Sequence, residues 1–262
     1  MKYFLAVLLG LVLSLHGFSQ GPVNPDSDPI ESTHPCEKTE WGMAIGNRST
    51  LCNGLRILVF GSAGASKGYI TNGIELNVLN DANAEGKING INLGLFYFDE
   101  EKVNGWAFSH ISFGLSKLNG LAFSGISMNI DKQNGIGLSG LLQQSEAING
   151  ISLAGIDITS RNLNGVALSG LVCLTDSTMN GIEIAAAFAR AETVNGLIVG
   201  IVTKTSKTKG LQIGLINRAH TMHGFQIGLI NNIQQNPRWC RTLPFINFRF
   251  AMDTSEKLID KH

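Results

Sequence analysis

Apolar and polar residues alternate in short segments along most of the chain, and an Asn-Gly pair marks each segment. In "LNGLAFSG", residues 118–125, the apolar positions after the marking glycine are Leu121 and Phe123, with Ala122 between them. Alternation with a period of two is typical of a β-strand with one buried face, whereas an amphipathic helix places apolar residues three and four positions apart. We therefore predict strands whose apolar residues, one and three places after each glycine, face the interior.

The Asn-Gly segments form an internal repeat. Twelve glycines mark its copies, and their spacing settles at 15 residues between Gly90 and Gly165. An asparagine precedes ten of them, while Lys209 and His223 precede the last two. A fixed period of this kind is the signature of a repeat architecture. The marking glycines are Gly54, Gly73, Gly90, Gly105, Gly120, Gly135, Gly150, Gly165, Gly181, Gly196, Gly210 and Gly224.

A second glycine follows four or five residues after the first in most copies, as at Gly125 and Gly140. Behind it the apolar positions resume with a shift of one, as at Ile126 and Met128. A shift of one residue would turn these side chains to the wrong face of a continuous strand. We expect a bend or bulge at the second glycine that returns them to the interior, and a polar tract that closes each copy.

One all-β architecture that fits is a repetitive β-solenoid of about twelve repeats of ~15 residues. Equivalent positions of successive coils would stack about 4.8 Å apart. Asparagine tolerates left-handed backbone angles, and its amide can hydrogen-bond to the same residue in the coils above and below. The expected structural ladder consists of Asn89, Asn104, Asn119, Asn134, Asn149, Asn164, Asn180 and Asn195.

The alternative is an antiparallel meander, or an outer-membrane β-barrel of about 12 strands, because Asn-Gly is also a strong hairpin signal. Two observations favour the solenoid. Alternate turns of a meander lie in different surroundings, which predicts a period of two repeats, but the sequence shows a period of one. Membrane barrels also carry aromatic girdles, and the repeats contain almost no Trp or Tyr.

The ends of the chain differ in composition from the repeats. Lys2 followed by the apolar run 4–15 predicts a signal peptide over residues 1–19, and a proline-rich linker follows over 20–36. The repeat array is expected over 37–234, a C-terminal capping segment over 235–250 and a polar tail over 251–262. The predicted locations are the cell surface or outer membrane of a diderm bacterium, or the medium.

Few residues suggest chemistry. We predict no catalytic residues, no cofactor and no metal site, because no cysteine pair has zinc-site spacing and no Ser-His-Asp grouping is visible. Export permits disulfides, and Cys36 could pair with Cys52. Cys173 lies at an apolar position and is expected to be a small buried residue. The net charge of +0 implies no preference for nucleic acid.

The phrases "NGISLAGI", "KGLQIGLINRA" and "HGFQIGLINNI", together with the terminal "LPFINFRF", resemble the surface-repeat-containing proteins of bacterial envelopes. The resemblance spans roughly residues 52–250. It implies an exported, surface-exposed protein and supplies no catalytic residues. We therefore expect a non-enzymatic scaffold, or an adhesion or ligand-binding protein, whose partner is a surface or envelope ligand, either protein or glycan. The alternative is an integral outer-membrane barrel with a structural or channel role.

Overall fold

The computed structural model describes residues 39–45, 51–60, 68–79 and 86–250, which belong to one compact unit, Glu37–His262. The predicted signal peptide, linker and polar tail lie outside the described residues, as does Cys36. All regular elements of the described part are β-strands. They are β1 (Thr39–Ile45), β2 (Leu51–Phe60), β3 (Ile70–Leu79), β4 (Lys87–Ser109), β5 (Ser112–Ser124), β6 (Ser127–Ser139), β7 (Leu142–Ala154), β8 (Asp157–Ser169), β9 (Val172–Ala185), β10 (Phe188–Val199), β11 (Val202–Ile213), β12 (Ile216–Ile233) and β13 (Thr242–Arg249).

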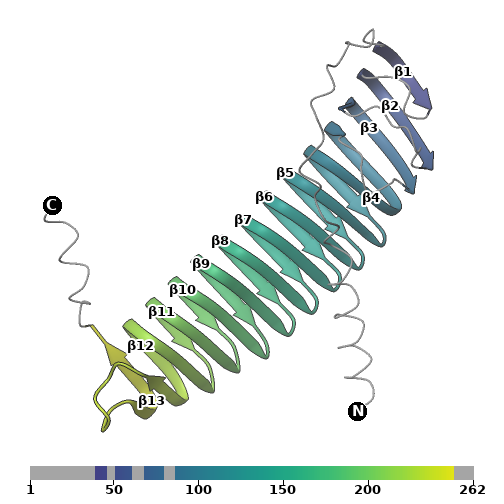
Figure 1. Cartoon of the computed structure of the whole chain (residues 1–262). Helices are drawn as coiled ribbons and strands as arrows, with labels where there is room; N and C mark the ends of the chain where they lie inside the picture. The colour runs from purple at the N-terminus through teal and green to yellow at the C-terminus, as the bar shows by residue number, and fades with distance from the viewer. Residues whose placement is uncertain (1–38, 46–50, 61–67, 80–85, 251–262) are drawn as a thin grey trace, which may run out of the picture. The chain divides into compact units, whose positions relative to one another are not determined.

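The thirteen strands form one sheet in chain order, and β1 to β12 pair in parallel (Figure 1). The fold is a β-solenoid of about 11 turns. The antiparallel meander or membrane barrel is therefore wrong, because successive strands run in the same direction. Only the last pairing among the described strands, β12 with β13, is antiparallel.

The register of the coils follows the Asn-Gly pairs. Asn104 and Gly105 of β4 lie opposite Asn119 and Gly120 of β5, and the same correspondence holds along the stack. The stack also contains one copy that the sequence pattern did not reveal. Gly42 pairs with Gly54 and also has a positive φ, 100° against 141°, although a tryptophan precedes it in place of asparagine.

The marking glycines lie within strands and not at corners. Gly120 has a φ of 141°, and a Cβ there would clash with the backbone carbonyl of Gly105 in the preceding coil. Both facts require glycine at this position. The expectation that the neighbouring asparagines use left-handed angles is wrong, because Phe245 is the only described residue other than glycine with positive φ.

Each coil presents five side chains to the interior, and β5 shows the pattern. Phe113, Leu115, Leu118, Ala122 and Ser124 are buried there, while their neighbours along the strand face outward. The coil turns after Ser124, whose hydroxyl donates a hydrogen bond to the carbonyl of Ser127 at 2.6 Å. In this coil the large side chains of Phe113, Leu115 and Leu118 therefore fill most of the interior, and they lie opposite the small side chains of Ala122 and Ser124.

The direction of the alternating apolar residues is opposite to the prediction. Leu121 and Phe123 face outward, and the small residue between them, Ala122, is fully buried. The reason is the width of the coil. A Cβ added at Gly137, which is equivalent to Ala122, would lie 2.5 Å from the Gln133 side chain across the interior, so no large residue fits there. The bend at the second glycine likewise buries Met128 but leaves Ile126 exposed.

Apolar and polar sections alternate along the interior. One apolar section extends from Ile88 to Ile130 and includes Phe98 and Phe113, whose rings stack with centroids 5.0 Å apart. A second extends from Ile148 to Ile198. Between them lie Gln133, Gln143 and Ser152, which hydrogen-bond to one another. The core is therefore interrupted by internally bonded polar groups.

Candidate functional site

The outward apolar side chains form a continuous surface along the stack, which we call the apolar face. It consists of two rows, one and three residues after the marking glycines. Every position of both rows is apolar, and none is buried. The first row is Leu55, Ile74, Ile91, Trp106, Leu121, Ile136, Ile151, Val166, Ile182, Leu197, Leu211 and Phe225; the second is Ile57, Leu76, Leu93, Phe108, Phe123, Leu138, Leu153, Leu168, Ile184, Val199, Ile213 and Ile227.

Neighbouring coils shield these side chains only from the sides. Trp106 is 62% exposed and Ile151 is 41% exposed. Within the second row the rings of Phe108 and Phe123 stack with their centroids 5.1 Å apart. The rows therefore pack along the stack axis but remain open above, and contact within one coil cannot cover them.

A groove runs beside the second row. Its walls include Phe123, Leu138, Leu153 and Leu168, and the second glycines Gly140, Gly155 and Gly170 also line it. The groove has a volume of about 380 Å³ and is open to solvent. It exists because glycine contributes no side chain, and a Cβ at Gly155 would clash with the carbonyl oxygen of Gly140. The surface therefore consists of apolar ridges, formed by the two rows, and a depression that runs between the second row and the turns at the second glycines.

The final strand extends the apolar face. In the antiparallel pairing of β12 with β13, Phe225 lies opposite Phe248 and Ile227 lies opposite Ile246. Phe248 and Ile246 are 56% and 53% exposed. Residues 235–250, expected to cap the array, thus add a rung to this surface.

The asparagine row borders the apolar face on the same side of the strands. Asn119 Nδ2 donates to Asn104 Oδ1 at 2.7 Å, and Asn134 Nδ2 donates to Asn119 Oδ1 at 2.9 Å. The row is continuous from Asn53 and includes every residue of the expected ladder: Asn53, Asn72, Asn89, Asn104, Asn119, Asn134, Asn149, Asn164, Asn180 and Asn195. Because each amide is bonded to the next, this border is polar and uncharged as far as Asn195, after which Lys209 and His223 continue the row.

Charged side chains gather in the polar tracts beyond the asparagine row. Lys117, Lys132, Glu146 and Arg161 are exposed there, so both signs are mixed. Arg161 Nη1 lies 3.5 Å from Glu146 Oε1. The outside of the coils is therefore divided into an apolar face, a neutral amide border and a charged edge.

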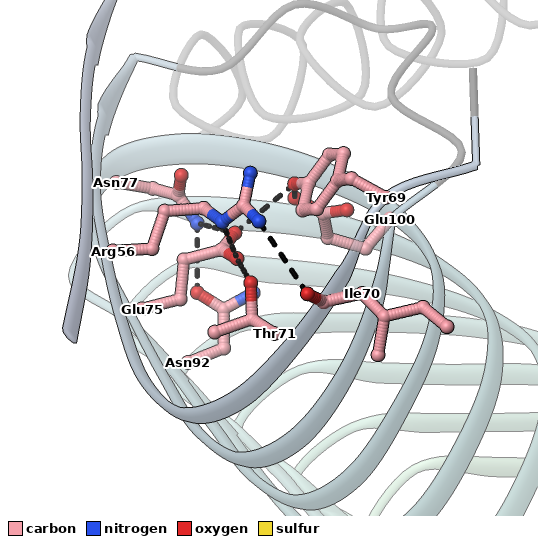
Figure 2. A network of polar contacts seen from close by, with 8 residues as sticks. All are labelled: Arg56, Tyr69, Ile70, Thr71, Glu75, Asn77, Asn92 and Glu100. Atoms are coloured by element: carbon pink, nitrogen blue, oxygen red, sulfur yellow. Dashed lines mark hydrogen bonds and ion pairs between the residues drawn. The ribbon is translucent and has the colours of Figure 1, made fainter. Parts of the chain in front are cut away.

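A buried polar network fills the first coils, and sequence reasoning missed it. Figure 2 shows Arg56 of β2 beside Glu75 of β3 inside the coil. Both side chains are 0% exposed, with Arg56 Nε 4.0 Å from Glu75 Oε2, and the guanidinium lies 4.6 Å from the centroid of the Tyr69 ring. The Tyr69 hydroxyl lies 2.7 Å from Glu100 Oε1 and 3.1 Å from Glu75 Oε1. Arg56 thus pairs with the buried carboxyl group of Glu75, and the Tyr69 hydroxyl links Glu75 to Glu100.

Hydrogen bonds hold this network in place. Thr71 Oγ1 donates to Glu75 Oε2 at 2.7 Å, and Asn77 Nδ2 donates to Asn92 Oδ1 at 2.8 Å. Burial, followed by the charges of Glu100 and Glu75, raises the pKa of Tyr69 far above its usual value, so its hydroxyl remains a neutral donor. The side chains lie inside the coils and bond to one another, which gives the network a structural role.

Charged residues at one position of the repeat indicate this network in the sequence. Arg56 and Glu75 stand two residues after a marking glycine, where other copies have Ala107, Ala122 or Ser152. Glu183 occupies the same position in β9 and is also buried. Thr175 donates a hydrogen bond to it at 2.8 Å, and burial raises the pKa of Glu183 from an ordinary 4.5 to about 8. Charged residues at this inward position therefore mark places where polar groups are bonded inside the coils.

The three described cysteines, Cys52, Cys173 and Cys240, are free thiols. Cys52 occupies the inward row and is buried, while its suggested disulfide partner Cys36 lies outside the described residues. Cys173 is buried as expected, and burial raises the pKa of its thiol. The described residues contain no group of three or more His, Cys, Asp or Glu side chains that could hold a metal ion. In the same part of the chain no helix has the length and apolar character needed to span a membrane.

Comparisons with known proteins found no matching family model, no similar curated protein and no similar solved structure.

Proposed function

We propose that the protein is an exported, non-enzymatic cell-surface repeat protein with a structural scaffold or binding role. The observation that carries this proposal is the apolar face. Its two rows of large apolar side chains point away from the interior over the whole parallel stack. Exposed apolar surfaces of this size are typical of interaction sites on folded proteins.

The arrangement of the polar groups also supports a binding role. The buried groups around Arg56 and Glu183 bond inside the coils, where a substrate has no access. The outer surface offers a flat periodic array instead. A surface of this kind suits an extended or repetitive partner, such as an envelope protein or glycan. The apolar run after Lys2 supports export, and the resemblance to envelope repeat proteins supports a location at the surface.

Expression of the full chain in a diderm host tests the location. We expect cleavage after residue 19, and digestion of the protein when protease is added to intact cells. The control variant is Leu8→Arg, which interrupts the apolar run and should keep the chain uncleaved inside the cell. An uncleaved wild-type chain in the cytosol would contradict the proposal.

A further inference from the structure

We infer that two copies of the chain pack against each other through the apolar face. This inference rests on the proposed scaffold role and names the partner of the face as a second copy of the same chain. Four features of the surface support it.

The first feature is its extent. Eleven steps of about 4.8 Å give a length of roughly 50 Å, and two rows about 7 Å apart cover a width of roughly 14 Å. The face thus measures on the order of 700 Å², above the roughly 300–600 Å² of the largest apolar patch on a typical monomer. It is close to the ~800 Å² that each partner contributes to a standard protein interface.

The second feature is its composition. The fully buried centres of homodimer interfaces are apolar and depleted of charge, with polar residues at the rim. The two rows contain no polar residue between β2 and β12, and the asparagine row borders them. Apart from Lys209, which continues the border row next to Gly210, the charged side chains of the polar tracts lie beyond that border, so most of the face can meet a second copy without placing like charges against each other.

The third feature is periodicity. Both copies carry the same ridges at the same spacing, because every coil adds one rung. Two sheets pack face to face about 10 Å apart, with their inner side chains interdigitating. The groove beside Leu138 and Leu153 can receive a ridge of the partner. Such a contact uses the same patch on both copies, as twofold symmetry requires.

The fourth feature argues against a lipid surface. Structures that lie on membranes combine an apolar face with a Lys- and Arg-rich border, and place Trp and Tyr at the interface. Here the border is a row of neutral amides from Asn53 to Asn195 with one lysine, Lys209, after it, and the edge beyond it mixes Lys117 and Lys132 with Glu146. Trp106 is the single Trp or Tyr in the two rows. The apolar face and its mostly uncharged border therefore match the same face of a second copy better than they match a layer of lipid headgroups.

Sedimentation velocity of the purified chain tests the inference. At 20 µM we expect twice the mass of one chain. The variant Leu138→Asn/Leu153→Asn/Leu168→Asn places three amides in the middle of the face and should sediment as a monomer. Circular dichroism checks that it keeps the β spectrum of the wild type.

Leu174→Asn provides the matched control. Leu174 is also a half-buried, outward leucine, but the equivalent positions of the preceding coils are Thr159 and Gln144, so it stands on a polar surface. We expect Leu174→Asn to remain a dimer, whereas the single variant Leu168→Asn should raise the dimer dissociation constant at least tenfold.

Three outcomes would overturn the inference. These are a monomeric wild type at 20 µM, a triple variant that is folded and still dimeric, and a monomeric wild type that floats with phosphatidylcholine vesicles. The last outcome would assign the face to lipid. Because the measurement uses purified protein, its failure is separate from a failure of export or surface exposure, which the expression experiment detects.

Discussion

The interior of the coils and the apolar face lie on opposite sides of the same strands, and in the first coils the interior is the more polar of the two. Arg56 and Glu75 point inward from β2 and β3, while Ile57 and Leu76 of the same strands point outward. A polar group inside a stack can bond to its equivalent in the next coil. An apolar row outside has neighbours along the stack but none above it. The difference shows that such coils can satisfy polar groups internally, whereas no described residue covers the apolar rows, which a second copy of the chain would cover.

Removal of the buried positive charge should have the largest effect. Arg56→Ala leaves the buried carboxyl group of Glu75 inside the coils without the guanidinium that pairs with it. Breaking a buried ion pair by deleting one partner costs about 3–5 kcal/mol. We expect that loss in the free energy of unfolding, measured by urea denaturation.

Arg161→Ala is the control for Arg56→Ala, because Arg161 pairs with Glu146 on the exposed charged edge. Surface pairs contribute little, so its midpoint should remain at the wild-type value. Equal losses in the two variants would show that the buried Arg56–Glu75 pair contributes no more to stability than an exposed pair.

A pair of leucines in one strand compares the interior with the apolar face directly. Leu163 of β8 is 0% exposed, and Leu168 of the same strand is half-buried in the second outward row. Leu163→Ala should lower the free energy of unfolding by about 2–5 kcal/mol, since it leaves a cavity. Leu168→Ala should cost about 1 kcal/mol, because part of its side chain is already in contact with water. A larger loss for Leu168→Ala would reverse the assignment of inside and outside.

The sequence is sufficient to predict the repeat, its strands and its register. The period of 15 residues aligns Asn119 with Asn134, and this alignment is the observed pairing. The direction of the side chains was predicted wrongly, because alternation identifies two faces without saying which one is buried. Residue size would have decided it. Between Ala107 and Ala167 the inward row holds only small residues, such as Ala122, Gly137 and Ser152, while the outward rows beside it hold large apolar ones, and small residues suit the narrow interior of these coils.

The buried network was beyond prediction for a related reason. Arg56 and Glu75 occur in the less regular early copies, and charged residues are rarely found fully buried unless they are paired. Their pairing depends on the stacking of β2, β3 and β4, which brings Tyr69 and Glu100 together across 31 positions of sequence. The sequence alone does not show that Tyr69 and Glu100 are close in space. Only the coiled path of the chain brings them into contact.

The interior carboxyl group of Glu183 should make stability depend on pH. Its pKa is raised in the folded state from 4.5 to about 8, so the folded chain binds the proton more tightly than the unfolded chain. Stability is therefore greatest below pH 4.5 and decreases as the pH rises towards 8, by at most about 1.4 kcal/mol per unit from this group. Urea midpoints between pH 5 and 8 should show the decrease. Glu183→Gln should flatten it, and an unchanged slope in that variant would assign the dependence to other groups.

The smallest effect is expected on the outside, at the amide border of the apolar face. Asn149 donates to Asn134 Oδ1 and accepts from Asn164 Nδ2, both at 2.9 Å. Asn149→Ala removes both hydrogen bonds, but water reaches this row, so the expected loss is about 1 kcal/mol.

Asn149→Asp keeps the acceptor and replaces the donor with a carboxylate oxygen facing Asn134 Oδ1. It should therefore cost more than alanine at pH 7 and less when the carboxylate is protonated at pH 3. Asn129→Ala, an exposed asparagine outside the ladder, is the control in the same urea series. If Asn149→Asp is as stable as the wild type at pH 7, the amides do not bond in the direction described, and the border stabilises the stack by backbone pairing alone.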